Sequence, residues 1–185
     1  SPAAARPDGA GGTVVFNSIG GGASQNHVHA HMFLRAFPLL SALAGARAPP
    51  LHGGAAGAVL DLVQAYHGAL PPPARCSCAC LRIRWPTAAP AAEEEAAALA
   101  CRLVHALNRS SLAFNLVLRP GCFLLVLRTR EAYDGYGLGA CHYAGLFLAQ
   151  DKGGLARLRT LADVCRVLSA CAAPAERLRR LWASA

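Results

Sequence analysis

Apolar residues occur in short runs and alternating stretches, a pattern typical of several strands and a few helices. Thr13–Ser18 is β-branched and aromatic and predicts a strand; a triple glycine follows, and the chain resumes as a second strand through Leu34. We therefore expect a hairpin over residues 13–34 with a wide, glycine-rich turn. Residues 1–12 are mostly small residues with little to bury, so we expect a disordered lead-in.

The middle of the chain combines strand-like segments with one helix. Pro38 to Gly57 is rich in Pro, Gly and Ala and predicts a loose connection, whereas the apolar run from Ala58 to Tyr66 fits a strand or a helix equally well. Cys76–Trp85 alternates between two sets of side chains, which predicts a strand. Acidic residues in a first turn, followed by leucines at every fourth position, predict a helix over residues 90–108.

The second half of the chain predicts one more hairpin and two helices. Two apolar runs separated by Pro-Gly predict a hairpin over residues 112–129. Cys141–Ala149 predicts a further strand, and amphipathic segments predict C-terminal helices within residues 155–183. The expected fold class is therefore α+β, a mostly antiparallel sheet with flanking helices, in one domain over residues 13–185.

Composition narrows the classes of partner. The 185 residues carry a formal net charge of +8, and Lys152 is the only lysine. This charge suits an anionic partner, but the arginines are scattered and aromatic residues are sparse, so we expect no nucleic-acid binding. No apolar run approaches the ~18 residues needed to span a bilayer, and we expect no membrane segment.

The cysteines indicate the expected cellular compartment, and the first residue indicates whether the chain is part of a longer protein. No signal peptide opens the sequence, so the eight cysteines are expected to be reduced thiols in the cytoplasm. The chain begins at Ser1 and its one methionine, Met32, lies inside the first predicted hairpin. We therefore expect it to be part of a longer protein.

Candidate chemistry is concentrated in three histidines at alternate positions, His27, His29 and His31. On a strand they share one face with neighbours roughly 7 Å apart, while Val28, Ala30 and Met32 turn toward the core. A neutral imidazole is a nucleophile toward phosphorus when its other ring nitrogen is tied to an acceptor.

Four interpretations of this row are open. The histidines could be core or surface residues without a role, a zinc or iron site, part of a phosphate-binding loop without covalent chemistry, or the centre of covalent nucleotidyl transfer. The glycine-rich turn favours the last, because glycine amides can approach phosphate oxygens closely and Ser24 adds a hydroxyl donor. We expect no metal and no other cofactor.

The segment Gly22-Ala23-Ser24-x-x-His27-x-His29-x-His31 resembles the signature of the histidine-triad superfamily. Its Gly-Ala-Ser opening resembles the branch with galactose-1-phosphate uridylyltransferase and the GDP-D-glucose and GDP-L-galactose phosphorylases. Thr13–Ser18, Phe114–Leu118 and Gly145–Phe147 also resemble segments of those phosphorylases, in the same order. The resemblance implies a histidine-triad-like fold, of which this chain would be an incomplete, C-terminal portion.

The resemblance also implies roles for individual residues. His29 would attack the α-phosphorus of a nucleoside diphosphate hexose, and the backbone carbonyl of His27 would fix the tautomer of its ring. Ser24 and the amides of Gly21 and Gly22 would hold phosphate oxygens. The implied partners are a nucleotide or nucleotide-sugar substrate and inorganic phosphate or a sugar phosphate, and a homodimer is left open.

Two departures from that branch keep alternatives open. The phosphorylases carry Gln where this chain has His31, which is typical of hydrolases and can protonate a leaving group. The position that they usually fill with Glu is His142 here. A hydrolase that releases a nucleoside monophosphate and a catalytically idle domain are therefore the alternatives to a phosphorylase.

Two weaker signals complete the candidates. Cys76, Cys78 and Cys80 share one face of a predicted strand, too far apart to hold one zinc ion without a bend, and structural thiols are the favoured interpretation. Asn115 lies on a predicted strand, where it would contact substrate or hold structure through buried hydrogen bonds.

Overall fold

A seven-stranded antiparallel sheet forms the centre of the computed structural model, which describes residues 12–23, 27–34, 46–65, 78–147 and 158–185, together with 37, 153 and 156. The strand order is β2-β1-β6-β7-β5-β4-β3. The strands are β1 (Thr13–Asn17), β2 (Ala30–Phe33), β3 (Pro50–Gly53), β4 (Val59–Ala65), β5 (Cys78–Arg84), β6 (Phe114–Arg119) and β7 (Cys122–Leu127).

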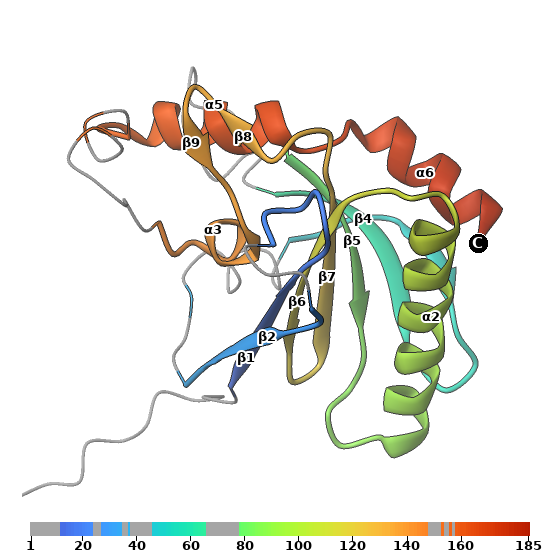
Figure 1. Ribbon diagram of the computed structural model, residues 1–185. Helices are drawn as coiled ribbons and strands as arrows, with labels where there is room; N and C mark the ends of the chain where they lie inside the picture. Colours follow the sequence, from blue (N-terminus) through green and yellow to red (C-terminus); the bar gives the residue numbers. More distant parts are fainter. Residues whose placement is uncertain are drawn as a thin grey trace, which may run out of the picture.

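Helices cover both faces of this sheet (Figure 1). One face packs against α2 (Pro90–Arg109) and α6 (Ala175–Ser184). The other packs against α3 (Ala140–Ala144), α5 (Leu161–Cys171) and a small hairpin, β8 (Ala132–Tyr133) and β9 (Tyr136–Gly137). No helix in the described ranges is long and apolar enough to span a bilayer.

Alternation along β5 explains why the sheet has two cores. Cys78 and Cys80 lie in the core beneath α3 and α5, whereas Ala79, Leu81 and Ile83 lie in the core beneath α2 and α6. Successive side chains on a strand point to opposite faces, so a strand that is covered on both sides is apolar throughout. The structure thus confirms the predicted strand within Cys76–Trp85, with Cys76 outside the described residues.

Several predicted elements are confirmed. The hairpin within residues 13–34 forms from β1 and β2, the helix over 90–108 is α2, and the hairpin over 112–129 is β6 and β7. The ambiguous apolar run is the strand β4, because it pairs with β3 on one side and β5 on the other. The described part of the C-terminal region contains α5 and α6; most of the predicted lead-in, residues 1–11, is outside the described residues.

Three predictions are wrong in part. The segment from Cys141 to Ala149, predicted as a strand, begins as the helix α3, which is followed by Gly145 with a φ of 105°. The prediction failed because a short apolar run does not distinguish a buried strand from a buried helix. The loose connection contains β3, an edge strand whose first residue is proline. Val28, Ala30 and Met32 are exposed rather than directed into the core, Val28 at 89% and Met32 at 69%, because this segment lies at the edge of the sheet.

Candidate active site

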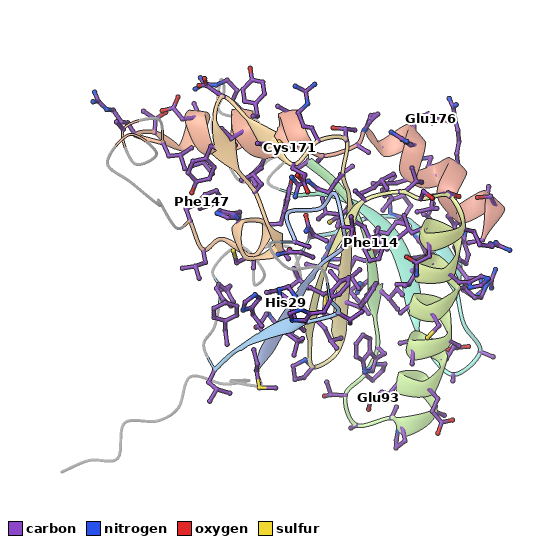
Figure 2. The ribbon with its side chains drawn as sticks, in the orientation of Figure 1. His29, Glu93, Phe114, Phe147, Cys171 and Glu176 are labelled. Carbon is purple, nitrogen blue, oxygen red and sulfur yellow. The ribbon has the colours of Figure 1, made fainter. Side chains whose placement is uncertain are left out.

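The three histidines lie at the edge of the sheet where β1 and β2 pair. His31 is on β2 opposite Val15 of β1, and His27 and His29 directly precede the strand. The ring centroids are 5.2 Å apart between His27 and His29 and 5.4 Å apart between His29 and His31. His29 is half-buried beside the sheet (Figure 2), whereas the other two imidazoles are exposed. The structure therefore places the histidines in a row with His29 in the middle.

A backbone contact orients the middle ring. Nδ1 of His29 lies 3.1 Å from the carbonyl oxygen of His27. A carbonyl oxygen only accepts hydrogen bonds, so Nδ1 carries a proton, and in the neutral ring the lone pair is then on Nε2. This is the contact and the tautomer that the resemblance implies for a nucleophilic histidine.

The glycine turn lies at the end of β1, next to this row. Its Gly21 N–H donates to the carbonyl oxygen of Ser18 at 2.9 Å, which closes the turn. The Gly22 N–H donates to Oε1 of Glu131 across a longer 3.4 Å. The expectation that the Gly21 amide holds a phosphate oxygen is therefore corrected, because that N–H is engaged within the turn, whereas the Gly22 N–H is engaged by a side-chain carboxylate. Ser24 lies outside the described residues.

A buried polar network fixes the turn to the sheet. Asn115 on β6 donates from Nδ2 to the carbonyl of Gly21 at 2.7 Å and to Oδ1 of Asn17 at 2.8 Å. Its Oδ1 accepts a 2.6 Å hydrogen bond from the Arg128 guanidinium. Since Asn115 is fully buried, its amide serves the structure, one of the two roles that the sequence left open.

The same network reaches the start of α3. Oδ1 of Asn17 also accepts from the backbone N–H of Ala140 at 2.6 Å, and its Nδ2 donates to the carbonyl of Gly22 at 3.3 Å. Asn17 follows Phe16, which pairs with Ala30, so the register places residue 29 across from Asn17. Asn17 thus joins the turn to the start of α3, and the β1–β2 register continues from it toward the His29 segment.

The imidazole of His142 is held at the start of α3. Its Nδ1 accepts a 2.9 Å hydrogen bond from the backbone N–H of Gly139, at the start of its own helix. Its ring lies edge-on to Tyr136 and Phe147, with centroids 5.6 Å and 5.5 Å away. The side chain is buried and stabilises the α3 segment that borders the site.

Three polar residues of the network, Asn17, Arg128 and Glu131, are not apparent as candidates from the sequence. Asn17 lies in the Thr13–Ser18 segment that resembles the phosphorylases, but nothing there singles out its side chain, and Glu131 is one of ten acidic residues. Arg128 does carry a signal, because it directly follows the five apolar residues Phe123–Leu127 of a strand buried on both faces. A charged residue in that position requires buried partners.

Metal binding finds no further support in the described residues. Among them, no three His, Cys, Asp or Glu side chains converge as metal ligands would. Burial raises the pKa of Cys80 to about 12, which keeps this thiol protonated and inert at neutral pH. Cys78 is buried in the same core and Cys76 lies outside the described residues.

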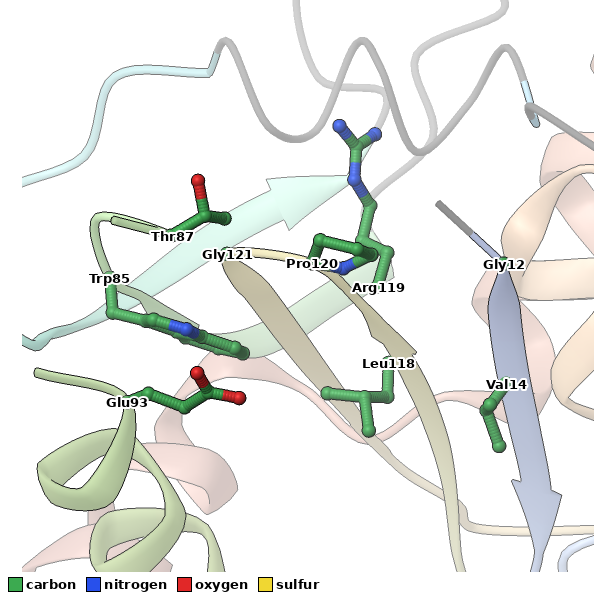
Figure 3. A pocket seen from close by; sticks show the side chains of 9 residues that line it. All are labelled: Gly12, Val14, Trp85, Thr87, Glu93, Leu118, Arg119, Pro120 and Gly121. Atoms are coloured by element: carbon green, nitrogen blue, oxygen red, sulfur yellow. The ribbon is translucent and has the colours of Figure 1, made fainter. Parts of the chain in front are cut away.

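A cavity of about 320 Å³ lies on the face of the sheet opposite to the one that carries His31. Figure 3 shows its walls, with Trp85 and Glu93 on one side and Leu118 and Val14 on the other. Val14 pairs with Met32, so its side chain points away from the face that carries His31 and Val15. This cavity is therefore separate from the histidine row.

Comparison with known proteins gives structural neighbours only. No family model and no curated protein sequence matches the chain. Yeast Ap4A phosphorylase Apa2 in complex with AMP superimposes with a TM-score of 0.63 at 17% identity, over 89% of this chain and 56% of that one. The same enzyme in complex with Ap4A gives a TM-score of 0.60 at 18% identity, over 89% and 55%.

A third structure of yeast Ap4A phosphorylase Apa2 gives a TM-score of 0.57 at 15% identity, over 89% of this chain and 56% of that one. The chain spans little more than half the length of these structures. At this identity the likeness concerns the fold, and it agrees with the α+β class, the antiparallel sheet and the partial fold that the sequence predicts. The chain thus has an α+β fold that it shares over most of its length with part of yeast Ap4A phosphorylase Apa2.

Proposed function

We propose that this chain carries a nucleotidyl-transfer site with His29 as the nucleophile and phosphorolysis of a nucleoside diphosphate hexose as its reaction. The hydrogen bond from Nδ1 of His29 to the carbonyl of His27 carries the proposal, because it selects the tautomer of the neutral ring that has its lone pair on Nε2. The half-buried ring belongs to the segment that leads into β2, the partner strand of β1, and the turn that follows β1 has a Gly22 N–H that already donates to a carboxylate.

The proposed reaction has two steps. Nε2 of His29 attacks the α-phosphorus, an N–P bond forms, and the anhydride P–O bond breaks to release the hexose 1-phosphate. Inorganic phosphate then attacks the same phosphorus, which yields the nucleoside diphosphate and restores the free imidazole. His27 holds the ring, and His31, whose ring lies edge-on to His29, protonates the leaving oxygen.

The choice of substrate rests on two separate observations. The resemblance of Phe16-Asn17-Ser18 and of Phe114–Leu118 to GDP-hexose phosphorylases supports a GDP-hexose. The fold is shared with an Ap4A phosphorylase that was solved with AMP and with Ap4A, which supports a nucleotide in general. GDP-hexose is therefore the first substrate to test, and Ap4A the second.

A trapping experiment tests the nucleophile. The full-length protein is incubated with a GDP-hexose or Ap4A labelled at the α-phosphorus, without phosphate, and an acid-labile phosphohistidine is sought. We expect label on wild type and on His105→Ala, a matched change of an exposed histidine on α2, and none on His29→Ala. Turnover by His29→Ala would refute the covalent mechanism, and absence of label and turnover with both substrates would favour the catalytically idle domain.

One observation favours hydrolysis as the second candidate. His31 is exposed beside His29, and a protonated imidazole there can assist transfer to water. Products formed with and without inorganic phosphate separate the two reactions, since only phosphorolysis yields a nucleoside diphosphate. His31→Gln should slow both reactions, because both pass through the step in which His31 protonates the leaving oxygen, so the products rather than this variant separate them.

A further inference from the structure

A buried cation lies directly behind the glycine turn. Arg128 is only 2% exposed. Its guanidinium donates five hydrogen bonds of 2.6–3.3 Å, to Oδ1 of Asn115 and to the backbone carbonyls of Gly21, Leu138, Arg130 and Glu131. All of these acceptors are uncharged. Among the described residues, no carboxylate forms an ion pair with Arg128.

The neighbouring thiol does not neutralise this charge. Burial raises the pKa of Cys171, an effect that the charge of Arg128 only partly offsets, so the thiol is protonated at neutral pH. The ring of Tyr143, 5.3 Å from the guanidinium carbon, adds a weaker attraction. Since a buried charge without a counter-ion is costly, an anion close to Arg128 would be stabilised.

The peptide between Gly21 and Gly22 transmits this charge toward the surface. Its carbonyl accepts from Nη1 of Arg128 at 3.3 Å and from Nδ2 of Asn115 at 2.7 Å. In a trans peptide the C=O and N–H point in opposite directions, so the Gly22 N–H points away from the guanidinium. Donors on the carbonyl polarise the peptide and make that N–H a stronger donor.

The Gly22 N–H already donates to a carboxylate of the same chain. Oε1 of Glu131 lies 3.4 Å from the Gly22 nitrogen, a long hydrogen bond from an exposed side chain. The backbone of Glu131 is fixed independently, because its carbonyl accepts from Leu138 N–H and from Arg128. The carboxylate can therefore leave the amide without any change in the loop.

We propose that the Gly22 N–H is an anion site, backed by the buried charge of Arg128, for which the carboxylate of Glu131 and a phosphate group of the substrate compete. The identification of the anion as a nucleotide phosphate rests on the proposed function. Glu131 is then a tethered competitor that weakens phosphate binding until a ligand displaces it.

Binding of AMP to Glu131→Gln and Glu131→Ala tests this competition by calorimetry, with adenosine as the ligand that lacks the phosphate. We expect both variants to bind AMP and inorganic phosphate about two- to fivefold more tightly than wild type, the scale of one exposed charge, and adenosine to be unaffected. Glu176→Gln, an equal change of charge at an exposed site on α6, leaves AMP affinity at the wild-type value.

Several results would overturn the proposal: AMP affinity that is unchanged or weaker in both Glu131 variants, an equal gain for adenosine, an equal gain in Glu176→Gln, or no binding of AMP and phosphate to any variant. The readout is an equilibrium affinity and needs no turnover. Failure of the competition is therefore separable from failure of the reaction, which the labelling of His29 reports.

Discussion

Asn115 donates a 2.7 Å hydrogen bond to the carbonyl oxygen of Gly21, a residue that lies 94 positions earlier in the chain. The two residues meet because β6 pairs with β1 in a register that sets Asn115 opposite Asn17, four residues before Gly21. The glycine turn is thus attached to the centre of the sheet as well as closed by its own hydrogen bond from Gly21 to Ser18. Its position relative to His29 depends on a buried amide.

Replacement of Asn115 should therefore affect both stability and the site. Asn115→Ala removes the partner of the Gly21 carbonyl and of Arg128, and we expect a loss of about 1–3 kcal/mol in the free energy of unfolding. A displaced turn should lower kcat by about tenfold or more. Urea unfolding and steady-state kinetics measure the two effects. Asn108→Ala, at an exposed position on α2, is the control and should change neither.

The sequence predicts most of the sheet and the principal helix because those elements carry regular patterns. The alternation in β5, the Pro-Gly turn between β6 and β7 and the leucine repeat of α2 are local signals, and each element forms where expected. The segment that became α3 has five helical residues, too few for a helical repeat to be visible.

Only those contacts of the site that join residues close together in the sequence could be predicted from it. The histidine row and the contact from His27 to His29 lie within five residues, whereas the bond from Arg128 to Gly21 joins residues 107 positions apart. Pairing across such a distance is decided by the sheet topology, which no local pattern reveals. The exposure of Val28 and Met32 has the same origin, since it depends on β2 being an edge strand.

A buried ion pair between β4 and β5 should make a large contribution to folding. Arg82 donates to both carboxylate oxygens of Asp61, at 2.8 Å and 2.7 Å, and both side chains are fully buried. Asp61→Asn removes the carboxylate charge that faces the buried Arg82, and we expect a loss of about 3–5 kcal/mol in the free energy of unfolding, measured with urea.

Two further variants control this expectation. Arg84 also contacts Asp61, but its side chain is 42% exposed, so Arg84→Gln should cost at most about 1 kcal/mol. The double change Asp61→Leu with Arg82→Met removes both charges and should cost less than Asp61→Asn alone. A loss below about 1 kcal/mol for Asp61→Asn would contradict the importance of the pair.

Glu95 should make the free energy of unfolding depend on pH in the acidic range. Its Oε2 accepts from the backbone N–H groups of Ala58 and Ala56, at 3.0 Å and 3.2 Å, and these bonds lower the pKa of the carboxyl. The pKa of this carboxyl is lower in the folded protein than in the unfolded chain, where it is about 4.3. The contact therefore stabilises the protein fully at a pH above the unfolded-state pKa, and this contribution is lost as the pH falls through the folded-state pKa.

Glu95→Gln should therefore flatten the fall in unfolding free energy between about pH 5 and pH 3. Urea titrations at several pH values measure that slope. Glu94→Gln, at the adjacent exposed position on α2, should keep the wild-type slope. Equal slopes for wild type and Glu95→Gln would show that the contact with the β3–β4 loop contributes nothing.

Gly22 and Gly57 offer a matched pair for testing how tightly the glycine turn is packed. Both have positive φ, 92° and 104°, so alanine is strained to a similar extent at either position. A Cβ at Gly57 meets nothing within 4 Å, whereas one at Gly22 overlaps the carbonyl oxygen of Leu138. The two substitutions therefore differ in the steric contact and not in the backbone conformation.

We expect Gly57→Ala to cost about 1–2 kcal/mol in unfolding free energy, the conformational penalty alone, and to leave kcat unchanged. Gly22→Ala carries the same penalty plus the overlap with Leu138, so it should cost more, and a turn displaced from Asn17 and Asn115 should lower kcat about tenfold or more. Urea unfolding and kinetics on both variants give the comparison. If Gly22→Ala matched Gly57→Ala in both measurements, the turn could move without consequence, and its placement beside His29 would not matter for the reaction.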